Sequence, residues 1–358
     1  MGAAADSAFR CSTVVRAVLK CLPVEDLFSC ARYDALWEEV ALPLLRKRLR
    51  FFALLQECLD GESLGEAFKE ELEFRLRTAQ RAQRHPAVAI AFCSCKYYDG
   101  DSVASCFPED TAVVQLDVTQ PVLFYRGGPE QKRWAACLCV LVLFHLPGAC
   151  FQCEWAPCES CLHTAAFKLG AKRRHQHRCP SKVAFIHKET GQRARFAFYA
   201  SSAYDQTTFR TPPILNYVAG CMLWTTRLRL LRPVLENSLD RPVLWGSVLF
   251  GHAVTATSVK FPALATIRGM SRHLESVRQN FSDAEEKTLV LYFQNDKLDV
   301  DVCDAICKVF RGATAVLGAP TSLTLDVKPF VTDIQQDAGD WTSPRLLTAV
   351  LVVVLGFR

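Results

Sequence analysis

The chain has 358 residues, of which 50% are hydrophobic and 22% are charged, with a formal net charge of +5. This length and composition allow two or three globular domains around a large core, and they exclude a disordered or fibrous protein. Seven Lys or Arg residues and no acid lie between Cys161 and Lys188. The rest of the chain is therefore slightly acidic, and total charge gives no reason to expect a nucleic-acid partner.

Targeting signals and cysteine usage point to the inside of the cell. The first residues lack the apolar core of a signal peptide, and Asp6 stands where N-myristoylation needs Ser or Thr. The longest apolar run, Ala135–Pro147, is interrupted by His145 and is too short to span a bilayer. The 17 cysteines are an odd number, which favours reduced thiols over a closed disulfide framework. We expect a cytoplasmic or nuclear protein without a membrane partner.

Three short helices are predicted at residues 11–50. An apolar stripe with four-residue spacing defines the first helix, and Pro23 ends it, because the residue before a proline avoids helical geometry. The second is the apolar run after Asp26, and the third follows Asp34 as its N-cap. Pro43 is expected to kink or end the third helix. Helices this short must pack on one another or on a partner.

An α/β pattern follows these helices. Phe51 to Leu59 is expected to be helical, and Gly65 to Arg81 predicts an amphipathic helix with Glu-to-Arg pairs at i,i+4, namely Glu71 with Arg75 and Glu73 with Arg77. Short apolar strands are then expected at residues 87–92, 111–118 and 122–125.

Residues from Trp134 to about Pro213 lose this regularity, so we expect an insertion or a poorly ordered segment there. A strand is expected before Gly251-His252. A βαβ unit is predicted from an apolar strand at residues 288–293, a helix capped by Asp299 and a second strand at residues 314–318. The sequence ends on an apolar strand that needs pairing inside a sheet. Because no helix follows that strand, we expect the α/β domain to be incomplete at its C-terminus.

The N-terminal segment resembles the F-box family in Leu19, Leu22-Pro23, Asp26-Leu27, Cys30, Trp37 and the apolar and basic stretch at residues 44–50. The resemblance implies a three-helix domain at residues 9–50 that binds the Skp linker subunit. The implied contacts are Leu19, Leu22, Pro23, Leu27 and Trp37. The alternative is a helical cap on the following domain.

The remaining elements are similar to the FIST domain that follows some F-boxes. The similarity lies in residues 70–73 with the strand after them, residues 261–267, the strand at 288–293 and residues 308–310. It implies an α+β or α/β fold with a first FIST-like part at residues 51–128, a cysteine-rich and basic insertion at residues 129–213, and a second FIST-like part at residues 214–358.

Together the two resemblances imply a substrate-recognition adaptor of an SCF (Skp–cullin–F-box) ubiquitin ligase. Such an adaptor holds a protein substrate near a cullin-RING ligase, so it supplies proximity and no catalysis or cofactor of its own. The alternative is a small-ligand-binding FIST-type sensor without a ligase role, whose ligand would bind where strands end.

One set of cysteines has metal-like spacing. Cys150, Cys153, Cys158 and Cys161 form two Cys-x2-Cys pairs, followed by two histidines and a further cysteine. Two such pairs can hold zinc with four thiolates. Only four residues separate the pairs, which is short for a zinc ribbon. A cysteine-rich segment without metal is the alternative, and we expect no cofactor unless zinc binds here.

Charged and cysteine patterns elsewhere have structural alternatives. The basic run Lys172–Arg174 is either a nuclear-localisation or phosphate-contacting patch or a solvated loop. Cys93 with Cys95 and Cys303 with Cys307 share faces but lack the Cys-x2-Cys spacing that tunes a thiolate. We therefore expect them to be packed in the core.

Two further patterns bear on catalysis or binding. His252 follows a strand at a position where α/β sheets place ligands, although a lone histidine there is more often structural. Gly61–Gly65 fits the GxSxG pattern, but a nucleophile elbow needs a buried strand before it. Because a helix is expected at Phe51–Leu59, a helix-linking loop is favoured.

Overall fold

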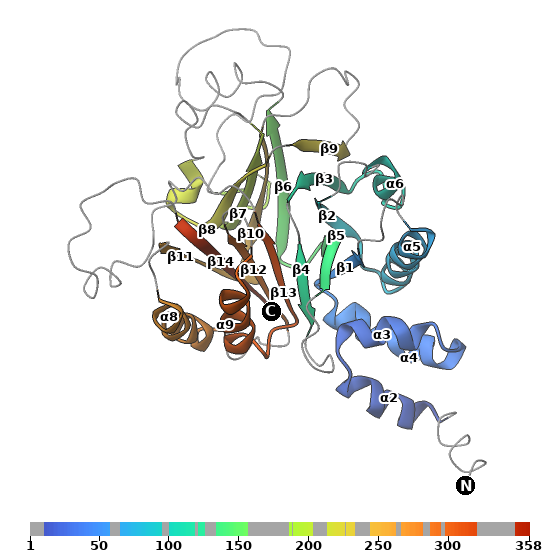
Figure 1. The fold of residues 1–358 in the computed structure, drawn as a ribbon. Helices are drawn as coiled ribbons and strands as arrows, with labels where there is room; N and C mark the ends of the chain where they lie inside the picture. Colours follow the sequence, from blue (N-terminus) through green and yellow to red (C-terminus); the bar gives the residue numbers. More distant parts are fainter. Residues whose placement is uncertain are drawn as a thin grey trace, which may run out of the picture.

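The computed structural model shows two β-sheets packed face to face, with helices on the outer side of the larger sheet (Figure 1). A mixed α and β fold, as predicted, is observed. No helix within the described residues is long and apolar enough to cross a membrane. The described residues are 11–57, 65–94, 100–118, 121–125, 134–156, 186–187, 189–202, 213–225, 227–232, 244–262, 266–281, 287–294, 298–320 and 348–358.

Three N-terminal helices are present, as predicted: α2 (Ser12–Cys21), α3 (Val24–Ala31) and α4 (Ala35–Arg48). Asp34 caps α4, because its carboxylate accepts a hydrogen bond from the backbone N–H of Trp37 at 2.9 Å. The helix does not end at Pro43 but continues to Arg48. Pro43 is exposed, so the carbonyl group that loses its N–H partner one turn earlier can bond to water.

Ten strands form the large sheet: β1 (Phe51–Glu57), β2 (Pro86–Cys93), β3 (Ala112–Asp117), β4 (Val122–Tyr125), β5 (Trp134–Phe144), β9 (Leu228–Arg232), β11 (Val254–Pro262), β12 (Thr288–Gln294), β13 (Ala315–Pro320) and β14 (Thr348–Phe357). Their order is β11-β14-β12-β13-β4-β5-β2-β3-β9, and β1 also pairs with β5. The helix predicted at Phe51–Leu59 is wrong, because residues 51–57 pair antiparallel with β5. That short apolar run has no helical period, so tertiary pairing decides its conformation.

The large sheet contains one arrangement of strands twice. In the first copy, β2 lies between antiparallel β5 and parallel β3, with α5 (Glu66–Arg81) before β2 and α6 (Gly100–Ala104) after it. In the second copy, β12 lies between antiparallel β14 and parallel β13, with α8 (Ile267–Gln279) before β12 and α9 (Val300–Val309) after it. Antiparallel strands complete both copies, β1 beside β5 and β11 beside β14.

The second copy contains the predicted βαβ unit, which is confirmed. Asp299 is the N-cap of α9, since its carboxylate accepts hydrogen bonds from the backbone N–H groups of Asp301 and Val302. The final apolar strand β14 is paired on both sides, by β11 and β12, and its residues 350–357 are buried. The hazard that an unpaired strand of this kind presents is thereby removed.

Four strands form the small sheet, in the order β6-β10-β7-β8: β6 (Ala149–Ala156), β7 (Ala194–Ser201), β8 (Ala219–Trp224) and β10 (Leu244–Gly251), with the 3-10 helix η1 (Pro213–Asn216) before β8. The predicted insertion at residues 129–213 is wrong for its described part, because it supplies β5 in the middle of the large sheet and β6 and β7 of the small sheet. A strand buried on both faces, such as Leu138–Phe144, shows no alternation that would reveal it in the sequence.

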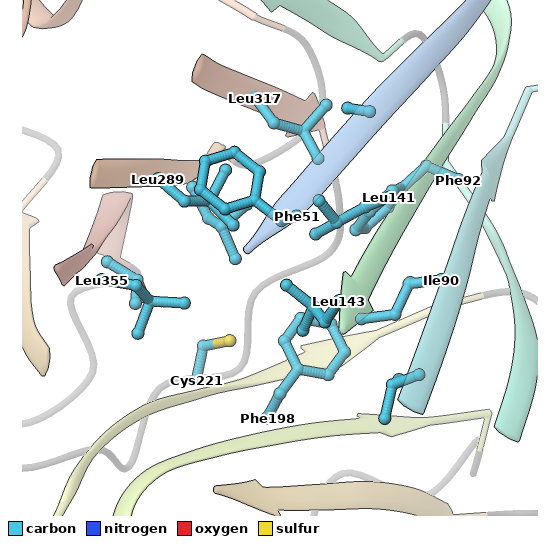
Figure 2. Packing of buried hydrophobic residues seen from close by; sticks show 14 of the residues in the cluster. Phe51, Ile90, Phe92, Leu141, Leu143, Phe198, Cys221, Leu289, Leu317 and Leu355 are labelled. Carbon is cyan, nitrogen blue, oxygen red and sulfur yellow. The ribbon is translucent and has the colours of Figure 1, made fainter. Parts of the chain in front are cut away.

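The main core lies between the two sheets. Side chains from both sheets point toward one another there. Figure 2 shows Phe198 of the small sheet together with Ile90, Leu141, Leu289 and Leu355 of the large sheet. A second core joins the large sheet to α2–α5, and a third joins it to α8 and α9. Each fully buried Leu or Phe stabilises the fold by roughly 1.5–3 kcal/mol. The N-terminal helices therefore belong to the same packed body as the strands.

Candidate functional site

A groove of about 530 Å³ opens between β11 and the β7–β8 side of the small sheet. We call it the β8–β11 groove. Its polar lining consists of Arg195, Tyr217, His252, Thr255, Thr257, Ser258 and Arg358, and its apolar lining consists of Ala194, Val218, Ala219, Val254 and Ala256. Because β11 and β8 are edge strands of the two sheets, the groove lies where the sheets meet without pairing into one ladder.

Ser258 bridges the two edges. Its hydroxyl oxygen accepts a hydrogen bond from the backbone N–H of Gly220 at 3.3 Å. Gly220 has no room for a side chain, since a Cβ atom there would lie 2.2 Å from the carbonyl oxygen of Ala197. The hydrogen bond joins β8 to β11, and the close approach at Gly220 packs β8 against β7. Ala219 and Ala256, both with small side chains, line the groove beside this bond.

His252 reaches the groove through a tight link between the sheets. It lies between β10 of the small sheet and β11 of the large sheet. Gly251 before it has φ +112°, and a Cβ atom there would lie 2.1 Å from the carbonyl oxygen of Gly148. Only glycine fits such a position. A Cβ atom at Gly148 would lie 3.1 Å from Cε1 of His252. The imidazole therefore packs directly against Gly148, where a larger residue would crowd it.

Two arginines line the same groove from different strands. Arg195 is exposed on β7 between the buried residues Ala194 and Phe196, as strand alternation requires. Arg358 follows β14, and its backbone N–H donates a hydrogen bond to the carbonyl oxygen of Ala253 at 2.9 Å. Neither guanidinium group forms an ion pair with a described residue. No described lining residue is an acid, so the groove is positively charged.

A second, smaller cavity of about 270 Å³ lies between α5 and the segment around Cys106. Of the two predicted Glu–Arg pairs on α5, Glu71 with Arg75 is confirmed at 2.7 Å. Glu73, which was predicted to pair with Arg77, lines this cavity, and its Oε1 atom lies 4.0 Å from the sulfur of Cys106. Burial raises the pKa of the Cys106 thiol, and the carboxylate of Glu73 raises it further. A thiol held protonated is a weak nucleophile, so this cavity offers little chemistry.

The residues predicted to bind the Skp subunit are placed mainly inside the molecule. Leu19 and Leu27 are fully buried in the core that joins the N-terminal helices to α5 and the large sheet. Leu22, Pro23 and Trp37 are half-buried, and Leu22 and Trp37 pack against the same core. The apolar face that the prediction assigned to a partner is thus largely covered by the chain's own α/β body.

The predicted zinc ligands are only partly described. Cys150 and Cys153 both lie on the extended strand β6, where residues three apart point to opposite faces. The Cys150 sulfur lies 3.6 Å from Oε1 of Gln192, and the Cys153 sulfur lies 3.8 Å from the hydroxyl of Ser247. This pair therefore lacks the tight turn that the zinc prediction needs. Cys158 and Cys161 lie outside the described residues.

The described residues contain no other candidate metal site. Within the part of the chain that the structure describes, no group of three or more His, Cys, Asp or Glu could hold a metal ion. The basic run Lys172–Arg174 and Cys95 lie outside the described residues, while Cys93, Cys303 and Cys307 are buried, as expected.

The GxSxG pattern lies largely outside the described residues, since only Gly65 of Gly61–Gly65 is described. The element before the pattern is strand β1 and the element after it is helix α5. The expected helix before the pattern was wrong, so the order of elements agrees with a nucleophile elbow. In an elbow the motif itself forms the turn between strand and helix, and Gly61–Leu64 lie outside the described residues.

Comparisons with known proteins give no match in sequence and a distant likeness in structure. No family model matches the chain, and no curated protein was found to be similar. A solved structure, the crystal structure of cyanuric acid hydrolase from A. caulinodans, is similar at a TM-score of 0.37 and 10% sequence identity, covering 86% of this chain and 99% of that chain. A likeness at this level transfers no activity, substrate or catalytic residue to the present chain.

Two predictions are corrected at this point. The chain was expected to be a non-catalytic SCF adaptor, but Leu19 and Leu27, two of the residues predicted to bind Skp, are fully buried in its own core. That burial covers much of the apolar face on which the adaptor prediction depended, and the expectation of a non-catalytic receptor loses its support with it. The resemblance of residues 9–50 to an F-box and of the α/β region to FIST domains stays a prediction.

Proposed function

We propose that this protein binds a small molecule in the β8–β11 groove. The observation that carries the proposal is the convergence of polar side chains from separate segments on one concave, partly apolar site. Arg195 comes from β7, Tyr217 follows η1, His252 lies in the β10–β11 link, and Arg358 follows β14. Its volume of about 530 Å³ lies within the range of small-molecule sites.

The position of the groove also supports binding. It lies beside an edge strand of each sheet, where backbone and side-chain polar groups are not used up by a neighbouring strand. Its lining is mixed, since Thr255, Thr257 and Ser258 line it from β11 together with the apolar residues Val254, Ala256 and Ala219. A few polar groups among apolar residues are typical of ligand sites.

A blocking substitution tests the proposal. Thr255 is exposed and lines the groove, so Thr255→Trp should fill the space without touching the core. We expect small molecules that raise the melting temperature of the native chain to lose that effect in Thr255→Trp. Thr13→Trp places the same side chain at an exposed position on α2, away from the groove (Figure 1), and should keep it.

Screening a library of small molecules by thermal shift, followed by calorimetric titration of each hit, measures this. The proposal fails if every stabilising molecule binds Thr255→Trp as tightly as the native chain. It also fails if Thr13→Trp loses binding to the same extent, because the loss would then reflect a general change in stability.

A further inference from the structure

The charged residues of the β8–β11 groove are of one sign. Arg195 and Arg358 both line it, His252 lies on the same wall, and its described lining contains no Asp or Glu. Placing two guanidinium groups on one small cavity without a carboxylate costs electrostatic energy. An anion bound between the two arginines would be attracted by both of them.

Four other described arginines have visible partners in the fold. Arg32 and Arg75 both pair with Glu71 at 2.7 Å. Arg48 donates to the carbonyl oxygen of Leu22 at 2.8 Å and Arg84 donates to that of Arg46 at 2.8 Å, so both satisfy carbonyl groups near helix ends. Their roles in the fold are therefore visible.

Arg195 and Arg358 differ from these arginines. Among the described residues, neither side chain has a carboxylate or carbonyl partner, and both side chains line the groove. Arg50 donates two hydrogen bonds of 3.3 Å to the backbone oxygen of Arg358, which hold the backbone of this residue at the groove.

We propose that the ligand of the β8–β11 groove carries an anionic group, a carboxylate or a phosphate, which Arg195 and Arg358 hold. This rests on the proposed function and names the chemical class of its ligand. Guanidinium groups bind carboxylate and phosphate oxygens through paired, charge-assisted hydrogen bonds. The hydroxyl of Ser258, whose oxygen accepts from the N–H of Gly220, still has its own proton to donate to such an oxygen.

The rest of the ligand is defined by the other lining residues. Tyr217 is 67% exposed, which is unusual for a large aromatic side chain, and it stands at the groove beside Val218 and Ala219. An apolar or planar group of the ligand can pack on this ring and cover it. The inferred ligand is thus a small molecule with one anionic end and one apolar end.

Four probes with matched shape test this class: benzoate with its uncharged counterpart benzamide, and phenyl phosphate with phenol. Binding to the full chain is measured by calorimetry at low salt and again at physiological salt. We expect the two anions to bind more tightly than their neutral counterparts, and to bind more weakly as salt screens the arginines.

Substitutions then assign the contacts. Arg195→Gln and Arg358→Gln should each weaken binding of the anions by roughly tenfold to a hundredfold, the loss of a hydrogen bond to a charged group, and leave benzamide unaffected. Arg193→Gln is the matched control, because Arg193 is an exposed neighbour that does not line the groove. It should change nothing.

Two outcomes overturn the inference. Either the neutral probes bind as well as the anions, or neither benzoate nor phenyl phosphate binds in a way that Thr255→Trp blocks. The proposed function is tested separately. If neutral molecules bind the native chain but not Thr255→Trp, the groove is a small-molecule site and only the inference of an anionic ligand is wrong.

Discussion

Phe92 and Phe293 lie with their ring centroids 6.4 Å apart in the core between the sheets. They occupy equivalent places in the two copies of the strand arrangement, because each is the penultimate residue of the strand that lies between an antiparallel and a parallel neighbour. The two halves of the large sheet thus meet through the same residue type at the same position. Their contact joins two parts of the chain that are about 200 residues apart in sequence.

Replacing these phenylalanines should show that they act together. Phe92→Ala and Phe293→Ala should each destabilise the protein by about 3–5 kcal/mol, through lost burial and a residual cavity. The double variant should lose about 0.5–1.5 kcal/mol less than the sum, the size of an aromatic pair. Urea unfolding measures all three. Phe92→Ala with Phe281→Ala is the control pair, since Phe281 lies in the α8–α9 core, and additivity for both pairs would contradict the coupling.

The N-terminal helices should respond to charge in their core rather than on their surface. Leu27 is fully buried, so Leu27→Asp should destabilise the protein by more than about 4 kcal/mol, because a carboxylate would be buried without a partner. Val18 is 39% exposed on α2, and Val18→Asp should change stability by less than about 0.5 kcal/mol. Chemical denaturation of both variants checks this. Equal tolerance of the two would mean that these helices do not pack on the α/β body.

The link between the sheets should depend on Gly251. Gly251→Ala forces a positive φ of 112° on an alanine and brings its Cβ against the carbonyl oxygen of Gly148, so we expect a loss of more than about 3 kcal/mol and weaker binding in the groove. Gly191→Ala is the matched control, because φ is +66° there but nothing lies within 4 Å of the added Cβ. It should cost only about 1–2 kcal/mol. Similar losses for both would show that the contact with Gly148 is unimportant.

Stability should depend on the ionisation of Glu25. Its Oε1 atom is buried at α3 and has no hydrogen-bond partner among the described residues. Burial raises the pKa of Glu25 to about 7, and Asp26 raises it slightly, whereas Arg75 and Arg48 lower it. A raised pKa in the folded state means that stability is fully present below the unfolded pKa, near 4.5, and is lost as the pH rises to about 7.

Glu25→Gln tests this ionisation. It should leave stability nearly unchanged at pH 4 and raise it at pH 8, by an amount up to about 3 kcal/mol, since each pKa unit corresponds to about 1.4 kcal/mol. Thermal or urea unfolding from pH 4 to pH 8 measures the difference. A constant difference between the two proteins over this range would show that Glu25 does not ionise with a raised pKa. Asp26→Asn, on the exposed side of α3, serves as the control.

Local patterns predicted several elements correctly, for physical reasons that lie within a few residues. The stripe of α5 buries Phe68, Leu72, Leu76 and Ala79, and its spacing is visible in the sequence because a helix has a fixed period. Asp34 and Asp299 cap their helices as predicted. The β12–α9–β13 unit was recognisable because a buried apolar strand, a capped helix and a second apolar strand follow one another directly.

The groove could be anticipated only in part. His252 was noted as lying at a strand end where ligands bind, and it does line the groove. Arg195, Tyr217 and Arg358 carry no mutual spacing that the sequence could reveal, because they come from β7, the turn after η1 and the end of β14. The positive φ of Gly251 and the close approach to Gly148 that place His252 are likewise properties of the folded chain.

The sequence by itself determined the mixed fold class, the amphipathic helices, their caps and the βαβ unit, since these depend on periodicity and on neighbouring residues. Only the tertiary structure decided that Phe51–Glu57 is a strand, that residues 134–156 and 194–201 lie in two sheets, and that Leu19 and Leu27 face their own chain. The physical reason is the same in each case. Apolar side chains are driven into the core, but the sequence around them does not show which distant part of the chain they will pack against.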